Sequence, residues 1–251
     1  LRHLRHVVFL DSAKFHPEQG RWSLLLADPA EVIFGTGCGV QWRNTDGTLQ
    51  FESDPWEAVE YFLSRFFSSI PCRAQDVLEA AGSGLVAGYL GYELGHALEK
   101  LPAPRRPVLD HPDFWLAYYD TAAVFDHAEG RAFLVSSGRS GRGSASLQRA
   151  RYRLDQFLDE LDSNVLPFPS VCESRSTIHD PRSTIHASPQ WRPLMSEQEY
   201  AERFDRIMSY IRAGDIYQAN LTYSFLADGV PSSIRTYERL RELNPAPFGA
   251  Y

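Results

Sequence analysis

The sequence predicts an α+β protein built mainly on antiparallel β-sheet. Three observations lead to this class: strand-like segments dominate the early part of the chain, two of the turns between them have hairpin sequences, and no regular alternation of strand and helix follows. A doubly wound parallel sheet requires that alternation, because parallel neighbours are joined by crossover helices. The sequence therefore favours sheets joined by hairpins, with separate helices.

The strands are predicted from short apolar or alternating runs bounded by turn sequences. Asp46-Gly47 and Glu129-Gly130 are the two hairpin turns, since a Gly after an acidic residue accepts the positive φ that tight turns need. A further strand runs into the Gly-Tyr sequence near residue 90. The predicted strands cover residues 39–42, 48–51, 84–92, 114–127 and 131–136.

The helices are predicted from apolar residues that recur at helical spacing and from their capping sequences. Asp54 and Ser196 can each cap a helix whose third position is Glu, which is a capping box. Gly214 stands where the helix after Ser196 should stop. Asn244-Pro245 ends the last helix, because the residue before proline leaves helical space. The predicted helices cover residues 55–67, 147–161, 196–213 and 232–243.

After Gly214 the chain alternates strictly between apolar and polar side chains. Tyr217, Ala219, Leu221, Tyr223 and Phe225 would lie on one face of a strand, and Gln218, Asn220, Thr222 and Ser224 on the other. The second face carries only neutral hydrogen-bonding groups. It suits either the floor of a polar ligand site or the solvated face of an antiparallel sheet.

Composition limits the class of protein. The 251 residues are 43% hydrophobic and 23% charged, as in soluble globular proteins, and the net charge is −7. A negative chain disfavours nucleic acid as a partner. No apolar run reaches the roughly 20 residues of a membrane span. Cys38, Cys72 and Cys172 form no paired motif, which favours a reducing, cytoplasmic environment.

Residues 163–195 are predicted to be a flexible, proline-rich connector. The segment contains five prolines, and Arg175–His179 recurs as Arg182–His186. The two histidines of the repeat are paired in sequence, but a polar segment without a core gives a metal no fixed geometry. No catalytic residue and no metal ligand is predicted from the usual motifs. Glu93 and Glu99 around His96 are conceivable acid–base groups, although local ion pairs are the favoured interpretation.

Four motifs occur in a fixed order: Leu10-Asp11-Ser12 with Gly20-Arg21-Trp22-Ser23, Gly88–Leu94 with Glu99–Pro102, Gly214–Leu221, and Asn244–Phe248. With these four motifs in this order, the chain resembles the chorismate-utilising enzymes. The resemblance implies stacked, mainly antiparallel sheets with helices packed outside. It covers the first half of a family member, so the fold is expected to be incomplete.

The resemblance also implies a division into regions. Residues 1–162 correspond to an N-terminal α+β region with the effector-pocket motif, and residues 196–251 to the truncated start of a chorismate-binding region. The chain begins without Met and stops within an apolar run, which predicts a piece of a longer protein. Magnesium ligands, the catalytic histidine and a catalytic Pro-Ile-Lys-Gly-Thr segment are expected in the missing C-terminal half.

An amino-acid pocket is predicted where the first and last motifs meet. Ser12 and the backbone around Arg21-Trp22 would provide the polar part for the ligand's carboxylate, and carbonyls beside Pro245 and Pro247 would accept from its ammonium. Phe248 and Trp22 would wall the apolar slot. In the family this pocket holds tryptophan, as regulator or as structural ligand. The predicted effector-binding residues are Ser12, Gly20, Arg21, Trp22, Pro247, Phe248 and Gly249. The alternative is that Pro-Ala-Pro only terminates a helix.

The family reaction replaces a hydroxyl of chorismate with an amino group, using Mg²⁺ and ammonia from a glutamine amidotransferase subunit. Tyr217–Leu221 resembles the aminodeoxychorismate branch, which serves 4-aminobenzoate and folate synthesis. Anthranilate synthases, of the tryptophan pathway, usually continue after Gln with apolar residues and then Ser-x-Arg, and place Met where Gly249 stands. The anthranilate branch is the runner-up, and a non-catalytic amino-acid-binding module is the alternative from another class.

Overall fold

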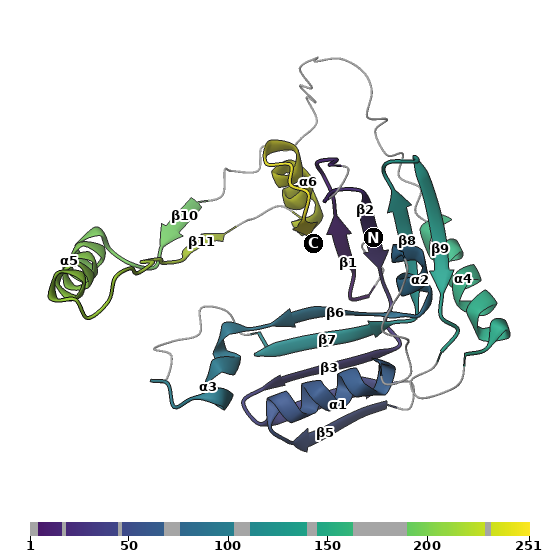
Figure 1. The fold of residues 1–251 in the computed structure, drawn as a ribbon, viewed down its shortest axis with the longest axis horizontal. Coiled ribbons are helices and arrows are strands. Elements are labelled where there is room, and N and C mark those ends of the chain that lie inside the picture. The colour runs from purple at the N-terminus through teal and green to yellow at the C-terminus, as the bar shows by residue number, and fades with distance from the viewer. Residues whose placement is uncertain are drawn as a thin grey trace, which may run out of the picture. The chain divides into compact units, whose positions relative to one another are not determined.

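Two five-stranded antiparallel sheets make up most of the structure (Figure 1). The computed structural model describes residues 5–16, 19–44, 47–67, 76–102, 111–139, 145–162, 190–228 and 232–251. The repeated Arg-Ser-Thr-Ile-His segments, Cys72, Cys172 and most of the predicted connector lie outside these ranges.

The first sheet has the strand order β12-β1-β2-β8-β9. Its strands are β1 (Val8–Asp11), β2 (Trp22–Leu26), β8 (Thr121–Asp126), β9 (Arg131–Ser136) and β12 (Gly249–Ala250). β8 and β9 form the hairpin that Glu129-Gly130 predicted, with Gly130 at φ +62°. The last strand of the chain lies beside the first, where Asp11 is paired with Gly249.

The second sheet has the strand order β5-β4-β3-β7-β6. Its strands are β3 (Glu31–Thr36), β4 (Gly39–Asn44), β5 (Gly47–Glu52), β6 (Leu85–Leu90) and β7 (Phe114–Tyr119). β4 and β5 pair in antiparallel register from Gly39–Glu52 to Asn44–Gly47, which confirms the first hairpin. Figure 1 shows the strands of one sheet running across those of the other.

The prediction of one strand over residues 114–127 was wrong, because the chain changes sheets at Asp120. β7 ends at Tyr119 in the second sheet and β8 begins at Thr121 in the first. The Asp120 side chain is fully buried and pairs with Arg149 and Arg153 of the helix α4 (Leu147–Asp162), at 3.1 Å each. A buried carboxylate needs such partners, and apolar alternation gives no sign of where a strand passes between sheets.

Helices cover the outer faces of the two sheets. α1 (Pro55–Phe67) packs on the second sheet, where the Phe66 ring stacks on Tyr118 at 3.9 Å. α4 places Phe157 against the first sheet. Between the sheets lies a shared core, whose buried members include Leu26, Val32, Ala117, Tyr119, Ala122 and Val124. Stacked antiparallel sheets with helices outside are thus confirmed.

Shorter helices complete this part: α2 (Val77–Gly82), the 3₁₀ turn η1 (Tyr92–Leu94) and α3 (Gly95–Leu98). α1 begins as predicted, because the Asp54 carboxylate accepts from the backbone N–H groups of Trp56 and Glu57 at 2.9 and 3.1 Å. α2 was not predicted from the sequence. It is capped by Asp76, which accepts from the Glu79 N–H at 2.8 Å.

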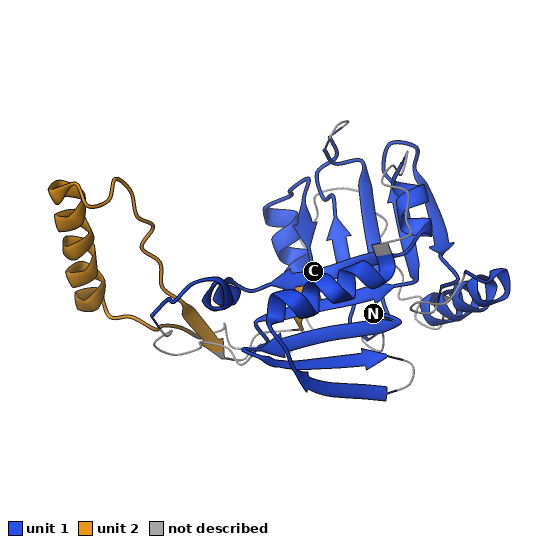
Figure 2. Cartoon of the chain, turned by 60° about the horizontal axis from the view of Figure 1, so that its bottom comes forward, with its two compact units in different colours: residues 1–171, 237–251 blue, residues 172–236 orange. Residues whose placement is uncertain are grey.

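The chain divides into two compact units (Figure 2). Residues 1–171 and 237–251 form unit 1, which holds both sheets, and residues 172–236 form unit 2. Residues 237–251 belong to unit 1 because β12 pairs with β1. The helix α6 (Ser233–Leu243) spans the boundary between the units. The division into regions 1–162, 163–195 and 196–251 stays a prediction of the sequence.

Unit 2 contains the helix α5 (Glu197–Ala213) and a two-stranded ribbon. The capping box of Ser196 and Glu199 is present, and Gly214 ends the helix in the left-handed region at φ +79°. The ribbon pairs β10 (Gln190–Pro193) with β11 (Phe225–Asp228). Residues 190–193, expected in the connector, are therefore a strand.

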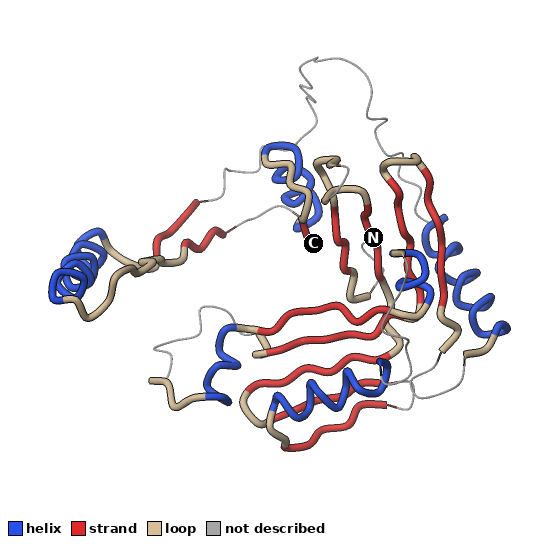
Figure 3. Tube along the Cα trace, viewed as in Figure 1, coloured by secondary structure: helices blue, strands red, loops and turns tan. Residues whose placement is uncertain are grey.

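The predicted strand from residue 217 onward is found only at its end. Between α5 and β11 the chain has no sheet pairing within the described residues, and Figure 3 draws it as loop. Alternating apolar and polar side chains give a strand one face that can be buried, but its backbone N–H and C=O groups also need a neighbouring strand to bond. That neighbour is a tertiary requirement which the sequence pattern cannot supply.

Candidate functional site

The first and last motifs of the chain meet at the edge of the first sheet. Phe9 and Tyr251 exchange two backbone hydrogen bonds of 2.9 Å, one in each direction. Farther along, the Lys14 N–H donates to the Ala246 carbonyl at 3.2 Å. This ladder places the Asn-Pro-Ala-Pro-Phe segment beside Ser12, so the juxtaposition expected from the sequence is formed by strand pairing.

Ser12 is buried and fastens three segments together. Its hydroxyl lies 2.7 Å from the Trp22 carbonyl and 2.9 Å from the Pro247 carbonyl, and its N–H donates to the Ser23 hydroxyl at 2.9 Å. One hydroxyl hydrogen is shared between two carbonyls. The groups that the sequence assigned to a ligand's carboxylate and ammonium are here bonded to each other.

Asp11 is the buried centre of a polar cluster, which consists of Asp11, Ser23, His127, Tyr237 and Arg241. Its carboxylate accepts from both the Nε and a terminal nitrogen of Arg241 and from the Tyr237 hydroxyl at 3.0 Å. The Ser23 hydroxyl lies 3.4 Å from this carboxylate and 2.7 Å from Nε2 of His127. We call this set the Asp11 cluster.

The Asp11 cluster ties α6 to β1. Burial, with the hydrogen bond to the Asp11 carboxylate, raises the pKa of Tyr237 to about 12. Tyr237 therefore stays protonated and donates at neutral pH. The same carboxylate raises the pKa of Arg241, which keeps its charge. The carboxylate is 1% exposed and the arginine 40%, so the buried member is the one that depends on its partner.

Arg21 is directed to Asp126 by two hydrogen bonds. Its Nε and a terminal nitrogen donate to the two carboxylate oxygens at 3.0 and 2.6 Å. The Arg21 hydrogen bond, helped by the N–H groups of Glu129 and Ala128, lowers the pKa of Asp126 to about 2. The guanidinium also lies 4.7 Å from the centre of the Trp22 ring, a cation–π contact. In this structure Arg21 therefore supports the turn and holds Trp22.

Gly20 has no room for a side chain, and Gly249 has little. A Cβ at Gly20 would lie 2.3 Å from the Lys14 carbonyl oxygen. At Gly249 it would lie 3.2 Å from the Tyr237 hydroxyl and 3.4 Å from the Asp11 carbonyl oxygen. Both glycines therefore permit tight packing around the Ser12 site.

The structure thus brings together Ser12, Trp22, Pro247 and Gly249, while the Phe248 ring is 76% exposed. Sequence reasoning missed the Asp11 cluster. One signal was available, because an acidic residue at the end of the apolar run Val7–Leu10 is an unusual choice for a buried strand. Its partners Tyr237 and Arg241 lie four residues apart on a helix, a spacing that also occurs on solvated faces.

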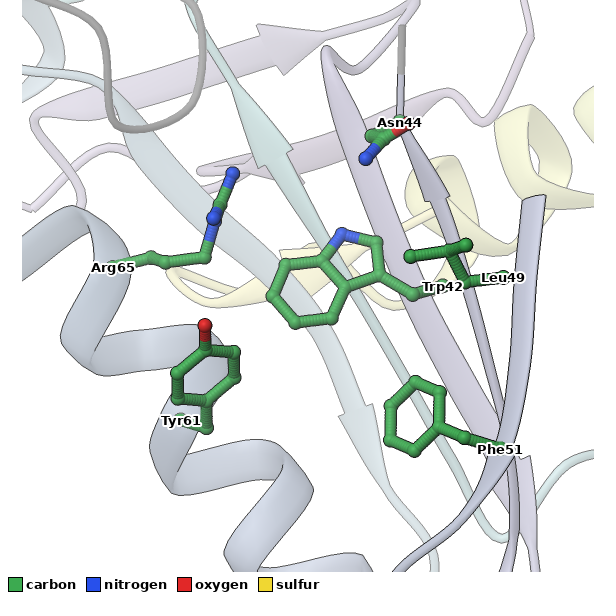
Figure 4. A pocket seen from close by; sticks show the side chains of 6 residues that line it. All are labelled: Trp42, Asn44, Leu49, Phe51, Tyr61 and Arg65. Carbon is green, nitrogen blue, oxygen red and sulfur yellow. The ribbon is translucent and has the colours of Figure 1, made fainter. Parts of the chain in front are cut away.

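A second candidate is a surface cleft of about 270 Å³ between α1 and the strands β4 and β5 (Figure 4). It is lined by Trp42, Asn44, Leu49, Phe51, Tyr61 and Arg65. The charge of Arg65 is satisfied by Glu31 at 3.0 Å, and the same carboxylate accepts from the Trp42 indole at 2.9 Å. These contacts brace the helix against the sheet, and they leave no uncompensated charge for catalysis.

Three other features bear on function: the Glu93–His96 motif, possible metal sites and possible membrane-spanning helices. Nε2 of His96 lies 3.0 Å from a Glu93 carboxylate oxygen, a local contact of the kind that the favoured interpretation of that motif expected. Over the described ranges no three His, Cys, Asp or Glu side chains are grouped so that they could hold a metal ion. The described helices include none that is both long and apolar enough to cross a bilayer.

Comparison with known proteins gives this geometry a family. The family model for chorismate-binding enzymes matches residues 17–251. The chain belongs to the chorismate-binding enzyme family. Aminodeoxychorismate synthase component 1 of Escherichia coli is 24% identical over 251 residues, with 100% of this chain and 49% of that protein covered. The Salmonella typhimurium protein of the same name is 27% identical, with 100% and 48% covered.

Anthranilate synthases are also similar to this member of the chorismate-binding family. Component 1 of Acinetobacter calcoaceticus is 26% identical over 82% of the chain and 39% of that protein. The crystal structure of anthranilate synthase component I from Streptococcus pneumoniae TIGR4 superposes with a TM-score of 0.68 at 20% identity, over 92% of this chain and 47% of that one. The fold is therefore that of the family, and the chain spans about half the length of these relatives.

Proposed function

We propose that this chain forms the first half of an aminodeoxychorismate synthase component 1. The complete enzyme would convert chorismate to 4-amino-4-deoxychorismate, with ammonia delivered by a glutamine amidotransferase subunit in the cytoplasm. Family membership supports the substrate, and the two relatives that the chain covers end to end at 24% and 27% identity support the branch.

Gly249 is the observation on which the choice of branch rests. Anthranilate synthases are expected to have Met at this site. Here a Cβ would already be 3.2 Å from the Tyr237 hydroxyl, so a longer side chain would require that hydroxyl to shift. The Tyr237 hydroxyl in turn serves the Asp11 carboxylate. The surroundings of Gly249 thus suit the small residue of the aminodeoxychorismate branch.

We further propose a tryptophan-type effector site at Ser12, Gly20, Arg21, Trp22, Pro247, Phe248 and Gly249. The supporting geometry is the meeting of both motifs at Ser12. Ser12 would act by fixing the carbonyls of Trp22 and Pro247, with the exposed Phe248 ring available to cover a bound side chain. Gly20 and Arg21 would shape the turn that carries Trp22.

The catalytic groups are proposed to lie in the part of the relatives that this chain does not match. The described residues do not fit a Mg²⁺ site, because no three carboxylate, imidazole or thiol groups converge among them. No reaction step is therefore assigned to this chain. Its proposed role is to complete the fold and to carry the effector pocket.

Anthranilate synthase component 1 is the second candidate, favoured by the relatives of that name and by the structural match to the Streptococcus pneumoniae protein. A non-catalytic amino-acid-binding module is the third. Complementation separates them: the 251-residue chain is combined separately with the second half of the Escherichia coli aminodeoxychorismate synthase and with that of the Acinetobacter calcoaceticus anthranilate synthase, each with chorismate, Mg²⁺ and ammonia, and the product is identified by mass. Activity restored mainly with the Escherichia coli half supports the proposal, activity restored mainly with the Acinetobacter half overturns the branch, and binding of a second half without any product supports the module.

A further inference from the structure

The helix and ribbon of unit 2 are well formed, but none of its described side chains is fully buried. Every residue in it whose side chain is described, within 191–227 and 232–236, is exposed or partly exposed. α5 nevertheless has a complete capping box and a left-handed glycine at its end. An isolated helix of this length is marginal in water, and most helices gain their stability by burying an apolar face.

The apolar face of α5 is a continuous stripe. Its members recur at positions i, i+4, i+7, i+8 and i+11, and we call them the α5 stripe: Tyr200, Phe204, Ile207, Met208 and Ile211. Phe204 is 48% exposed and Tyr200 is 37% exposed, although the latter contacts Tyr223 with ring centres 5.7 Å apart. Tyr223 of the following segment therefore covers part of the stripe, while Phe204 stays half exposed. α5 and this segment both belong to unit 2 (Figure 2).

The extended segment before β11 has no strand pairing within the described residues, and a backbone hydrogen bond is formed at its last residue. Residues 217–224 alternate as a strand does, yet no strand pairing reaches them in the described part of the chain. Next to the β10–β11 ribbon, the Leu194 N–H donates to the Ser224 carbonyl at 2.9 Å. Tyr217 is 92% exposed. Alternating apolar side chains and backbone groups without strand pairing are typical of a segment to which another strand can be added.

We propose that the α5 stripe and residues 217–224 form one docking surface for the polypeptide that corresponds to the unmatched half of the longer family members. That polypeptide would supply a β-strand to residues 217–224 and apolar side chains to the α5 stripe. The occupant is chosen by length, since the chain covers only 49% and 48% of its two full-coverage relatives. The proposed docking surface depends on the chain's membership of the chorismate-binding family, and it does not depend on whether the chain belongs to the aminodeoxychorismate or the anthranilate branch.

The chemistry of the surface favours this occupant over a charged one. The polar face of the segment consists of Gln218, Asn220, Thr222 and Ser224, none of which is ionised. A strongly charged peptide or a nucleic acid would find no opposite charge there and would lose hydration. A neighbouring strand, by contrast, satisfies the backbone and places apolar side chains against Tyr217, Ala219, Leu221 and Tyr223.

Hydrogen exchange tests the proposal with the 251-residue chain and three second halves, those of the Escherichia coli and Salmonella typhimurium relatives and of the Bacillus subtilis protein of the same name, which is 24% identical over 98% of this chain. The chain alone should exchange rapidly at 217–224, and a bound second half should protect 217–224 and α5. Phe204→Glu should weaken binding roughly ten- to a hundredfold, because it places a charge where a phenyl ring would be buried. Ser209→Glu adds the same charge on the opposite face of α5 and should have little effect.

Three results would overturn the docking surface. They are the absence of binding by all three second halves, binding that leaves 217–224 unprotected, and equal weakening by Phe204→Glu and Ser209→Glu. Thr222→Pro provides a second variant, because it removes one N–H from the proposed strand without adding charge. It should also weaken binding, while the melting of unit 1 stays unchanged. Binding, together with activity restored mainly by the Acinetobacter calcoaceticus half, would leave this inference standing and overturn only the proposed branch.

Discussion

Ser12 shows how one side chain can join parts of a sequence that are far apart. Its hydroxyl and N–H contact Trp22, Ser23 and Pro247, so a single residue connects β1, β2 and the segment before β12. A buried hydroxyl in this arrangement has a structural role even without a ligand. Its substitution should therefore change both the stability of unit 1 and the affinity for an effector.

Ser12→Ala should lower the free energy of unfolding by about 1 kcal/mol, the usual net worth of one hydrogen bond. Tryptophan affinity should fall about ten- to a hundredfold, because the carbonyls of Trp22 and Pro247 lose their common donor. Urea denaturation and calorimetry measure the two effects. Ser64→Ala is the matched control, since Ser64 is exposed on α1 and bonds only the Tyr61 carbonyl at 2.8 Å. Wild-type protein freed of ligand that releases no heat with tryptophan would contradict the pocket.

Asp126 should make unit 1 sensitive to acid. Its pKa is lowered to about 2 in the folded chain, chiefly by the Arg21 hydrogen bond, whereas an unfolded Asp titrates near 3.9. The unfolded state therefore binds more protons between these values. The stabilisation is fully present above about pH 4 and is lost as the pH falls toward 2.

Asp126→Asn should consequently be less stable than the wild type at pH 7, and the difference should shrink as the pH approaches 2. Denaturation curves at several pH values measure this difference. Glu129→Gln serves as the control, because Glu129 is 52% exposed and lies 3.5 Å from the same arginine. A gap between wild type and Asp126→Asn that is constant from pH 7 to 2 would show that the Arg21–Asp126 pair does not control acid stability.

At the scale of elements, α6 and β12 are held to the first sheet by a small set of contacts. β12 has only two residues, and its register pairs Asp11 with Gly249. The Asp11 cluster reinforces this short strand from the side of α6. A two-residue strand contributes few hydrogen bonds, so the cluster should dominate the attachment of α6.

Arg241→Met should destabilise unit 1 by roughly 3 kcal/mol, because it leaves the buried Asp11 carboxylate without its cation. The remaining donors, Tyr237 and Ser23, compensate only partly. Arg239→Met on the same helix removes an exposed pair with Glu242 and should cost under about 1 kcal/mol. Urea denaturation of the two variants gives the comparison. Equal effects would mean that the Asp11 cluster does not hold α6.

At the scale of the whole molecule, the described residues form a core and two packed sheets, and the catalytic groups are proposed to lie in the part of the relatives that this chain does not match. Catalysis needs its nucleophile, metal and acid–base groups together, and loss of such a unit costs several powers of ten in rate. The 251-residue chain with chorismate, Mg²⁺ and ammonia should therefore form no detectable amination product, as measured by mass spectrometry. Turnover at a rate well above the buffer control would place the catalytic groups within these residues.

The sequence by itself determined the class of fold, the first hairpin and most helix limits. These features depend on local physics: Asp54, Ser196 and Gly214 act on backbone groups a few residues away. Because such effects are local, the helices that lead into the last two of the four motifs could be predicted from the sequence. Ser12 and Pro247 were expected to meet because of the family resemblance, and not because of any local pattern.

Only the tertiary structure decided where the chain changes sheets, which partner each buried charge takes, and whether an alternating segment becomes a strand. Asp120 marks the crossing because Arg149 and Arg153 lie over it. Asp11 is buried because α6 brings it an arginine and a tyrosine. Residues 217–224 alternate like a strand but remain unpaired in the described chain. In each case the outcome depends on a group distant in sequence, whose position no local pattern of side chains encodes.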